Sequence, residues 1–273
     1  MRFENALGRS AIDLAELLTV CFEDYVIPIQ FSPSAIAALL RSDSIDLEST
    51  LLAVDGDSVI GAAVICRRGG VTRLGGMAVA KPFRGSGVGS GLMSQVLDDA
   101  RARGEREFML EVFEHNERAR IFYERFGLRA IRRLIGGNLV ADPARAASPL
   151  AETTYEELAF AIAARGATAT SWELSPAAVL QYMPPTAAYE HQGLRCAAHP
   201  LGESLLLVRS IALTSSDDAA KLSALVAGLA TRYPGRAAQV PPYFPEPEFA
   251  EVFANVPFTP ARLAQIQMHL SLS

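Results

Sequence analysis

A glycine-rich stretch from Leu74 to Gly89 holds the residues whose types and spacing are best suited to chemistry. Its first part is short and apolar and is typical of a buried strand, and the apolar residues after Gly89 recur at helical spacing. The loop between them carries Arg84 and the glycines Gly85, Gly87 and Gly89. Such a loop presents backbone N–H groups at the positive end of a helix dipole, and glycines let an anion approach them closely. The stretch therefore predicts an anion site suited to phosphate.

The spacing of the loop residues narrows the choice of phosphate ligand. No Gly-Lys-Ser or Gly-Lys-Thr closes a Walker A loop, and the G-x-G-x-x-G spacing of dinucleotide-binding proteins does not occur here. The loop instead contains R-x-x-G-x-G, formed by Arg84, Gly87 and Gly89. This pattern resembles the acetyl-CoA loop of the GNAT superfamily of N-acetyltransferases. The hexapeptide alone leaves a plain glycine-rich connection between a strand and a helix open as the alternative.

A second group of residues resembles the other GNAT signature. The group consists of Leu110-Glu111-Val112, Asn116, Ala119, Tyr123 and Gly127-Leu128. Members of that superfamily commonly carry an asparagine, a small residue, a tyrosine and then Gly-Phe at this spacing. Leu128 is therefore a mild departure, at a packing position. With both signatures in order, the first half of the chain is identified as a member of the superfamily.

The order of the expected elements agrees with this resemblance. Helices are expected over Ser10–Phe22, with Ser10 as the N-cap, and over Ser34–Arg41, behind the cap Ser32-Pro33. The later elements are a hairpin of Leu51–Val54 and Val59–Cys66, a strand ending at Val79, a helix closing at Gly104, a strand at Phe108–Phe113, a helix with Tyr123 and a strand at Ile131–Leu139. We therefore expect a mixed α/β sheet of the α+β kind, which is the GNAT acyl-CoA N-acyltransferase fold.

The resemblance implies a role for each residue of the two signatures. The loop amides and the helix N-terminus would clamp the pyrophosphate of acetyl-CoA, and the central strand would offer backbone groups to the pantetheine arm. Asn116 would hydrogen-bond that arm, and Tyr123 would be the general acid that protonates the leaving thiolate. The implied residues that bind acetyl-CoA are Met77, Ala78, Val79, Arg84, Gly85, Ser86, Gly87, Val88, Gly89 and Asn116. No metal is expected.

The candidate catalytic residues have alternatives that the sequence leaves open. Glu111 lies in an otherwise apolar strand, which predicts a general base acting through water, or a substrate contact. The alternative is a structural pair with an arginine. A helical tyrosine such as Tyr123 commonly only packs against its neighbours, which is the alternative to the acid. His115 is a weaker candidate, and we expect it in a loop.

Several carboxylates lie in or beside the first two expected helices. In GNAT-like proteins this segment walls the acceptor pocket, and carboxylates facing such a pocket would favour a cationic amine. Solvated surface carboxylates are the alternative. The residues concerned are Glu23, Asp24, Asp43, Asp46 and Glu48.

Composition limits the class of protein. The chain has 273 residues, 50% hydrophobic and 20% charged, which suits one large or two modest globular domains. Its net charge of −5 argues against binding to nucleic acid or an anionic membrane. No apolar run reaches the roughly 18 residues of a membrane span, and the N-terminus lacks a signal-peptide pattern. The scattered cysteines Cys21, Cys66 and Cys196 are expected to be reduced packing residues in a cytoplasmic protein.

The second half of the chain repeats the order of the first. The stretch Ala141–Pro149 predicts a linker, so we expect a catalytic GNAT domain over 1–141 and a GNAT-like domain over 150–273. The repeat consists of a strand at Leu205–Leu213, a helix with Leu222 and Leu229, a strand at Ala237–Val240, a rigid loop at Pro241–Pro245 and a helix with Phe249 and Phe253.

This second domain is expected to be degenerate and non-catalytic. Aligning Gly235 with Gly104 places Asp218 opposite Gly87, where a carboxylate would repel a diphosphate and could instead cap the helix. A second alignment places Phe253 opposite Tyr123 and Glu246 opposite Asn116.

The two halves together predict an N-acetyltransferase. It would move acetyl from acetyl-CoA to a primary amine of a small molecule, by direct attack in a ternary complex. The alternatives are a non-catalytic acyl-CoA-binding or regulatory module and a protein N-acetyltransferase. The acceptor and the oligomeric state, including a homodimer, are left open by the sequence.

Overall fold

The computed structural model describes residues 1–21, 32–142, 149–164, 170–213 and 218–272. The chain divides into two compact units. The first unit consists of Met1–Val112, Asn116–Ile131 and Gln267–Ser273, and the second of Phe113–His115 and Arg132–Ile266.

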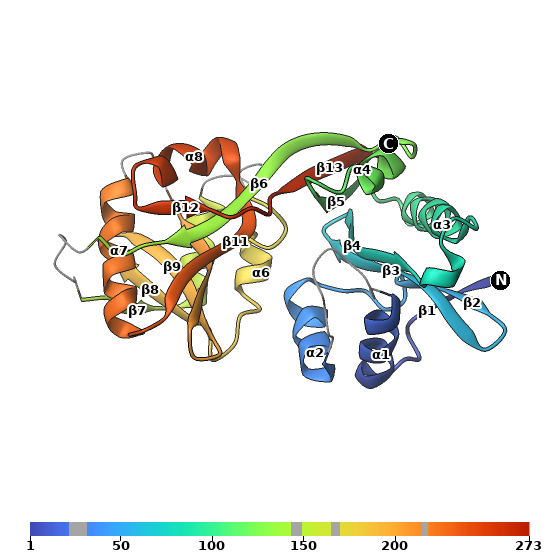
Figure 1. The fold of residues 1–273 in the computed structure, drawn as a ribbon, viewed down its shortest axis with the longest axis horizontal. Helices are drawn as coiled ribbons and strands as arrows, with labels where there is room; N and C mark the ends of the chain where they lie inside the picture. The colour runs from blue at the N-terminus through green and yellow to red at the C-terminus, as the bar shows by residue number, and fades with distance from the viewer. Residues whose placement is uncertain (22–31, 143–148, 165–169, 214–217, 273) are drawn as a thin grey trace. The chain divides into compact units, whose positions relative to one another are not determined.

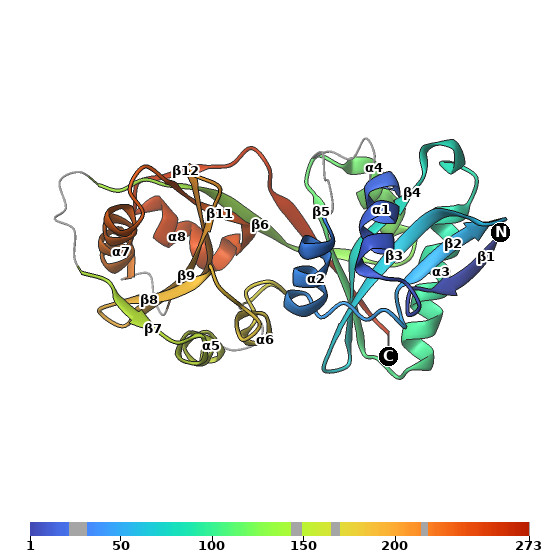
Figure 2. The ribbon, with the colours of Figure 1, turned by 90° about the horizontal axis from the view of Figure 1, so that it is seen from below.

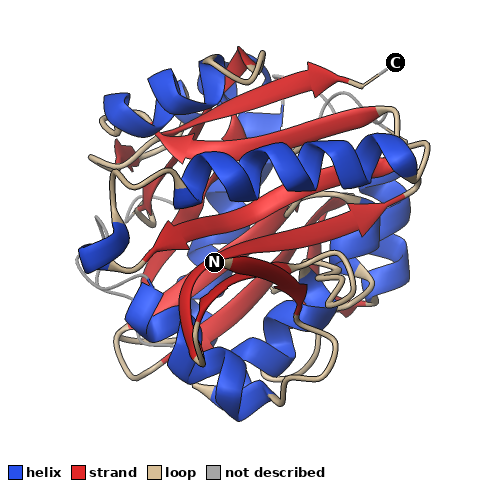
Figure 3. Ribbon diagram, turned by 90° about the vertical axis from the view of Figure 1, so that its right-hand side faces the viewer, coloured by secondary structure: helices blue, strands red, loops and turns tan. Residues whose placement is uncertain are grey.

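The first unit is a mixed sheet with helices on both faces. Its elements are β1 (Arg2–Asn5), α1 (Ala11–Cys21), α2 (Pro33–Ser42), β2 (Leu51–Asp55), β3 (Ser58–Arg68), β4 (Val71–Val79), the 3₁₀ turn η1 (Lys81–Phe83), α3 (Val88–Ala102), β5 (Glu107–Phe113), α4 (Glu117–Glu124) and the last strand of the chain, β13 (Gln265–Ser271). The strand order is β1-β2-β3-β4-β5-β13, and β4 and β5 run parallel. Helices α1 and α2 cover one face of this sheet and α3 and α4 the other (Figures 1 and 3).

The helix caps and turns form where the sequence predicts them. Ser10 and Asp13 make a reciprocal capping box at the start of α1, with Asp13 N donating to Ser10 Oγ at 3.1 Å and Ser10 N to Asp13 Oδ2 at 2.9 Å. Ser32 caps α2 by accepting from Ala35 N at 3.1 Å. Gly56 turns the β2–β3 hairpin at φ 59°, a left-handed conformation that glycine adopts without strain. Residues 22–31, with the expected end of the first helix, lie outside the described residues.

Strand β4 carries the irregularity that shapes the candidate site. Its antiparallel register with β3 shifts between Leu74 and Gly76, so Gly75 is the extra residue of a β-bulge. A Cβ on Gly75 would lie 2.8 Å from Cys66 Sγ, so a larger residue fits only if the thiol moves. Parallel pairing with β5 runs from Val71 to Leu74 and ends there. Beyond the bulge, β4 continues to Val79 without pairing in register with β5.

The second unit is also a sheet between two pairs of helices. Its elements are β6 (Arg129–Leu139), β7 (Ala151–Thr153), α5 (Tyr155–Ala163), α6 (Pro176–Val179), β8 (Ala187–His191), β9 (Leu194–Leu201), β10 (Leu205–Ala212), α7 (Ala219–Arg232), β11 (Ala237–Pro245), α8 (Glu246–Ala254) and β12 (Phe258–Pro260). The strand order is β6-β11-β10-β9-β8-β7, with β12 paired to β6. One core cluster packs α7 and α8 on the sheet, and another packs α5 and α6 on the strands β8, β9 and β10 (Figure 2).

The second unit repeats the first, which confirms the expected α/β fold and its repetition. The elements from β7 to α8 follow the same order as those from β1 to α4. Even the bulge recurs, because the register of β10 with β9 shifts between Val208 and Ser210, and parallel pairing with β11 ends one residue earlier. The turns after α3 and α7 both use a glycine with positive φ, Gly104 at 72° and Gly235 at 79°.

Two features differ from the sequence-based description. Pro241–Pro245 is part of strand β11 and not a separate loop, although the register with β6 is irregular between Val240 and Phe244. The boundary between the units falls after Ile131, not in the linker after residue 141, and the C-terminal strand returns to the first unit. The reason is pairing: β13 lies next to β5, where Leu272 N donates to Arg106 O at 2.9 Å. Composition along the chain cannot show which strand a terminal segment joins.

Cys66 and Cys196 are buried and not joined in a disulfide within the described residues, as expected of packing residues. Burial raises the pKa of the Cys196 thiol to about 12, so it stays protonated. Within the described part of the chain, no helix combines the length and apolarity that crossing a bilayer requires.

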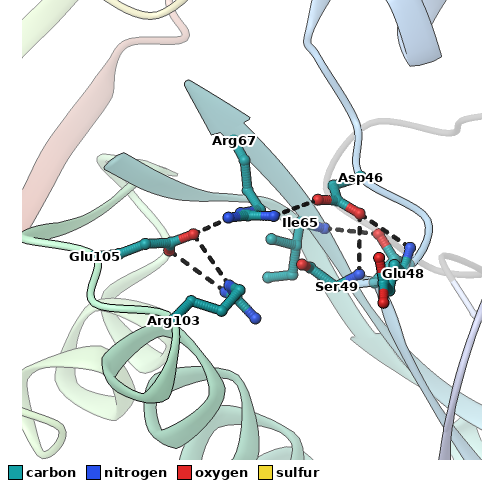
Figure 4. Close-up of polar contacts among 8 residues, drawn as sticks. Asp46, Glu48, Ser49, Ile65, Arg67, Arg103 and Glu105 are labelled. Carbon is teal, nitrogen blue, oxygen red and sulfur yellow. Dashed lines mark hydrogen bonds and ion pairs between the residues drawn. The ribbon is translucent and has the colours of Figure 1, made fainter. Parts of the chain in front are cut away.

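A polar network connects the loop that follows helix α2 to the sheet of the first unit (Figure 4). Arg67 on β3 donates to Asp46 Oδ2 at 2.7 Å and to Glu105 Oε1 at 2.5 Å. Asp46 Oδ1 also accepts from the backbone N–H groups of Glu48 and Ser49, at 3.0 and 3.1 Å. Burial alone would raise the pKa of Asp46, but the hydrogen bonds from Arg67 and from the two N–H groups outweigh it, so this pKa lies below its usual value.

We predict that Asp46→Asn lowers the free energy of unfolding by about 1 kcal/mol at pH 7, a modest loss because the pair is partly solvated. A depressed carboxyl pKa stabilises the fold above the unfolded-state pKa, and this contribution disappears as the pH falls through the folded-state pKa. The difference between wild type and variant should therefore shrink below about pH 4. Urea denaturation at a series of pH values measures it.

Asp57→Asn is the matched control, because Asp57 is exposed in the β2–β3 turn. A loss from Asp46→Asn that persists undiminished at acid pH would show that shape, and not charge, explains the effect.

Candidate functional site

The glycine loop between β4 and α3 is open on its outer side. Gly85 and Gly87 have positive φ, 83° and 92°, and Gly87 is the N-cap of α3. A Cβ on either residue would have no atom within 4 Å, so open space lies next to this backbone. The first N–H groups of a helix have no partner within the helix, and they carry the positive end of its dipole. The loop therefore has the room and the polarity that an anion requires.

The start of α3 lies close to the end of β4 and to α4. A Cβ on Gly89 would be 3.7 Å from Val79 Cγ2 and 3.9 Å from the Phe122 ring. Arg84 Nε donates to the backbone oxygen of Val79 at 2.9 Å, so the arginine of the motif is folded back on the strand end. The structure thus gathers the predicted strand residues Met77–Val79, the loop Arg84–Gly89 and helix α4.

Glu111 and Arg73 form a buried ion pair in the same sheet. Arg73 Nε donates to Glu111 Oε2 at 2.6 Å, and the two side chains are only 8% and 3% exposed. Gln267 on β13 donates from Nε2 to the other oxygen, Oε1, at 2.8 Å, and is itself fully buried. Each oxygen of Glu111 therefore has one partner, which leaves further lone pairs because a carboxylate has about four acceptor positions. This is the arginine pair that the sequence left as an alternative, and a role in proton transfer stays a prediction.

The charges around Arg73 leave a net negative group. Arg73 Nη1 also lies 3.5 Å from Oδ2 of Asp43, the C-cap residue of helix α2. Two carboxylates share one guanidinium, so Asp43, Arg73 and Glu111 together carry one negative charge. Arg73 is closer to Glu111 than to Asp43, and the Asp43 side chain is 22% exposed against 3% for Glu111.

The other predicted acidic residues do not join this group. Asp46 belongs to the Arg67 network, and Glu48 is exposed. Glu23 and Asp24 lie outside the described residues.

Helix α4 holds the remaining predicted residues. Tyr123 is half-buried, with its ring edge against Phe122 at a centroid distance of 5.3 Å. Asn116 is the N-cap of α4, where Oδ1 accepts from Ala119 N at 3.1 Å. His115 lies in the exposed turn before it and stacks on Phe113. Asn116 thus has a structural task in the described residues, and its contact with acetyl-CoA stays a prediction.

Two residues of the buried group, Arg73 and Gln267, were not predicted from the sequence. Arg73 is a charged residue in the apolar strand Val71–Val79, the same signal that singled out Glu111. Polar and apolar residues alternate over Gln265–Leu270, which indicates a strand but not its neighbour.

Comparison with known proteins agrees with this geometry. Residues 12–128 match the acetyltransferase (GNAT) family. Over these residues, which make up less than half of the chain, the sequence is similar to the GNAT family, whose members use acetyl-CoA as the acetyl donor. It is 39% identical over 93 residues to N-alpha-acetyltransferase 30 of Schizosaccharomyces pombe, which covers 32% of this chain and 61% of that protein. The chain thus matches about three fifths of its relative's length.

Solved structures show that the fold extends over both units. A tandem GNAT protein from the clavulanic acid biosynthesis pathway superposes with a TM-score of 0.65, covering 100% of this chain and 98% of that one at 14% identity. A GCN5-related N-acetyltransferase from Sphaerobacter thermophilus superposes with a TM-score of 0.64. The superposition covers 99% of this chain and 95% of that one, also at 14% identity. At such identities the likeness concerns the fold alone, and it is the fold of a tandem GNAT protein.

The sequence of the second half has no glycine at the place that corresponds to the glycine loop. Asp218 is the N-cap residue of α7, at the position that the sequence alignment places opposite Gly87, but its side chain does not make the expected capping hydrogen bond. Its carboxylate is buried and accepts from Lys221 Nζ at 3.0 Å. A buried carboxylate at this helix end would oppose a diphosphate. Residues 214–217 lie outside the described residues, and a structural role of the second unit stays a prediction.

We predict that Gly87→Asp weakens acetyl-CoA binding at least about tenfold, because a carboxylate at the start of α3 would face the pyrophosphate. Calorimetric titration of the whole chain with acetyl-CoA measures the dissociation constant.

Gly87→Asn provides the matched control. Asn has almost the same size as Asp, and both tolerate positive φ better than other side chains. If the Asp and Asn variants bind acetyl-CoA equally well, the phosphate does not lie at this helix end.

Proposed function

We propose that this protein is an acetyl-CoA-dependent N-acetyltransferase that modifies the primary amine of a small molecule. The observation that carries the proposal is the open glycine loop at the start of α3 in the same unit as a buried, negatively charged group. The loop offers unpaired helix N–H groups to a diphosphate, and the group around Glu111 suits an ammonium ion. The match of residues 12–128 to the GNAT family supports acetyl-CoA as the donor.

Binding of the donor would use backbone atoms more than side chains. The loop residues Gly85–Gly89 would hold the pyrophosphate through N–H groups that glycine leaves accessible. The end of β4, from Met77 to Val79, pairs with β3 but not in register with β5. Its backbone groups that face away from β3 would be available to the amides of the pantetheine arm, whereas the Val79 oxygen already accepts from Arg84 Nε. The same groups could orient the thioester carbonyl.

The acceptor enters as an ammonium ion and must lose a proton before it reacts. Glu111 would accept that proton through water, on a lone pair that neither Arg73 nor Gln267 occupies. The amine nitrogen then forms a bond to the thioester carbon, and the carbon–sulfur bond breaks. Tyr123 would donate its hydroxyl proton to the leaving sulfur, and the second proton that the nitrogen loses as the amide forms would restore the hydroxyl of Tyr123. Both substrates are present together, so the transfer needs no acyl-enzyme.

A second acceptor class has a specific observation in its favour. The curated relative is named as an N-alpha-acetyltransferase, and the matched 93 residues are 39% identical. The α-amine of a peptide or protein N-terminus is a primary amine and would satisfy the same charge requirement. The small-molecule amine and the protein N-terminus are therefore to be tested side by side.

The proposal predicts CoA release that depends on an amine, and a loss of turnover in Tyr123→Phe. A thiol assay with acetyl-CoA would compare polyamines, amino acids, aminoglycosides and N-terminal peptides. Tyr123→Phe should lower kcat at least about tenfold and leave the acetyl-CoA dissociation constant within about twofold, because only the transferable proton is removed. Tight acetyl-CoA binding without release for any amine would favour the non-catalytic module. Unchanged turnover in Tyr123→Phe would remove this residue from the mechanism.

We further predict that Glu111→Gln and Gln267→Leu both lower kcat. Glu111→Gln removes the proton acceptor but keeps the shape of the side chain, so kcat should fall about 100-fold or more. Gln267→Leu leaves Glu111 Oε1 without its partner, which should cost about 1–3 kcal/mol of stability and disturb the position of the carboxylate. Steady-state kinetics with a reactive amine, together with urea denaturation, separates the two effects.

Met268→Leu is the matched control, because Met268 is buried on the same strand and a Met-to-Leu change nearly conserves volume. Normal kcat in a folded Glu111→Gln variant would leave Glu111 with its structural pair alone.

A further inference from the structure

The second unit contains a cavity of about 300 Å³ between strand β6, helix α8 and the segment that follows it, and we call it the α8 cavity. Its walls are largely apolar. Phe253 and Phe258 stack on one another with ring centroids 4.5 Å apart, and Ile135 and Ala264 add to the lining. Small residues create the space, above all Ala250 and Ala254 on the exposed side of α8.

The charged residues among the lining are Arg133 and Glu246. Arg133 Nη1 donates to Glu246 Oε1 at 2.7 Å, and Arg133 Nε donates to both oxygens of Glu114, at 3.0 and 3.1 Å. The hydrogen bonds with Glu114 first, and then those with Glu246, hold the pKa of Arg133 above its usual value, so the guanidinium is permanently charged.

This group therefore carries one negative charge in excess. The N-terminus of α8 contributes roughly half a positive charge beside Glu246, which reduces the excess but does not cancel it. The side chains of Arg133 and Glu246 are 38% and 39% exposed, so the group is reached from solvent. An anion would meet two carboxylates there, whereas a cation would complete the charge balance.

The volume of the α8 cavity limits the size of the apolar part of a bound ligand. An apolar cavity of about 150 Å³ is large enough for benzene. Twice that volume holds one ring with a short chain, and Phe258, which is partly exposed and stacked on the buried Phe253, provides an apolar wall for it.

We propose that the α8 cavity binds an organic ammonium ion with a compact apolar body of about one ring. The apolar body lies against Phe258, which stacks on the buried Phe253, and the ammonium group lies at Glu246. The site belongs to the second unit, which holds neither Glu111 nor Tyr123, so it does not depend on the proposed catalytic function.

The test is an NMR titration of the uniformly ¹⁵N-labelled chain with 2-phenylethylamine, 2-phenylethanol and 3-phenylpropanoate. We expect the amine to shift the amide signals of Ala250, Phe253 and Ala261 and to bind about fivefold more tightly than the alcohol, as one charge contact close to water contributes. The carboxylate should bind no better than the alcohol. Equal affinity for amine and alcohol, or no shift at these residues, would overturn the proposal.

Two variants locate the site. Ala250→Phe places a ring in the cavity from an exposed position, so the ring of the amine can no longer be buried there. The affinity for the amine should fall at least about tenfold, because burial of an apolar group of this size contributes about that much. Ala163→Phe on the exposed side of α5 is its matched control and should bind normally. Glu246→Gln should reduce the preference for amine over alcohol to below about twofold. Undiminished binding in Ala250→Phe would place the amine elsewhere.

Glu111→Gln separates this proposal from the catalytic one. Because Glu111 belongs to the first unit, the variant should keep the amine-induced shifts at Ala250 and Phe253 even if it loses turnover. Loss of those shifts in Glu111→Gln would show that the amine was bound as an acceptor, and the α8 cavity would not be its site.

Discussion

Strand β13 is the element on which the candidate acid–base group depends, although it is the last strand of the chain. A strand must find hydrogen-bonding partners for its backbone, and β13 finds them next to β5. Gln267 thereby reaches Glu111 across 156 residues of sequence and binds the oxygen that Arg73 leaves open. An ion pair as buried as Arg73–Glu111 is unfavourable unless its remaining polar atoms are satisfied. The C-terminal strand thus completes a group that the first 131 residues only begin.

A second constraint, the bulge in the central strand, is shared by both units. In β4 and in β10 the parallel pairing ends close to the bulge, so the two units offer the same backbone frame. What differs is the start of the next helix. Gly87 leaves the N-terminus of α3 open, whereas Asp218 places a buried carboxylate, paired with Lys221, at the N-terminus of α7. The same fold therefore supports an anion site in one unit and opposes it in the other.

Local signals explain what could be predicted from the sequence. Caps such as Ser10 and Ser32, the Gly56 turn and the glycine loop act within a few residues, and each lies where its pattern predicts. The role of β13 could not be found in this way, because an alternating segment such as Gln265–Leu270 pairs with any strand of suitable length. The hydrogen bond from Gln267 on β13 to Glu111 could not be predicted for the same reason. Pro241–Pro245 was misjudged because proline removes a donor, yet β11 accommodates it where its register with β6 is irregular.

The two negatively charged groups show how burial decides what the same net charge can do. Asp43, Arg73 and Glu111 carry one excess negative charge, and so do Glu114, Arg133 and Glu246. The side chain of Glu111 is 3% exposed and that of Glu246 is 39% exposed. Water screens the exposed group, so it can favour a cation only modestly and has little influence on proton transfer. Glu111 lies in a lower dielectric and is fixed by hydrogen bonds on both oxygens, whereas Asp43 in the same group is 22% exposed. The proposals of proton transfer in the first unit and of binding without chemistry in the second rest on that difference in burial.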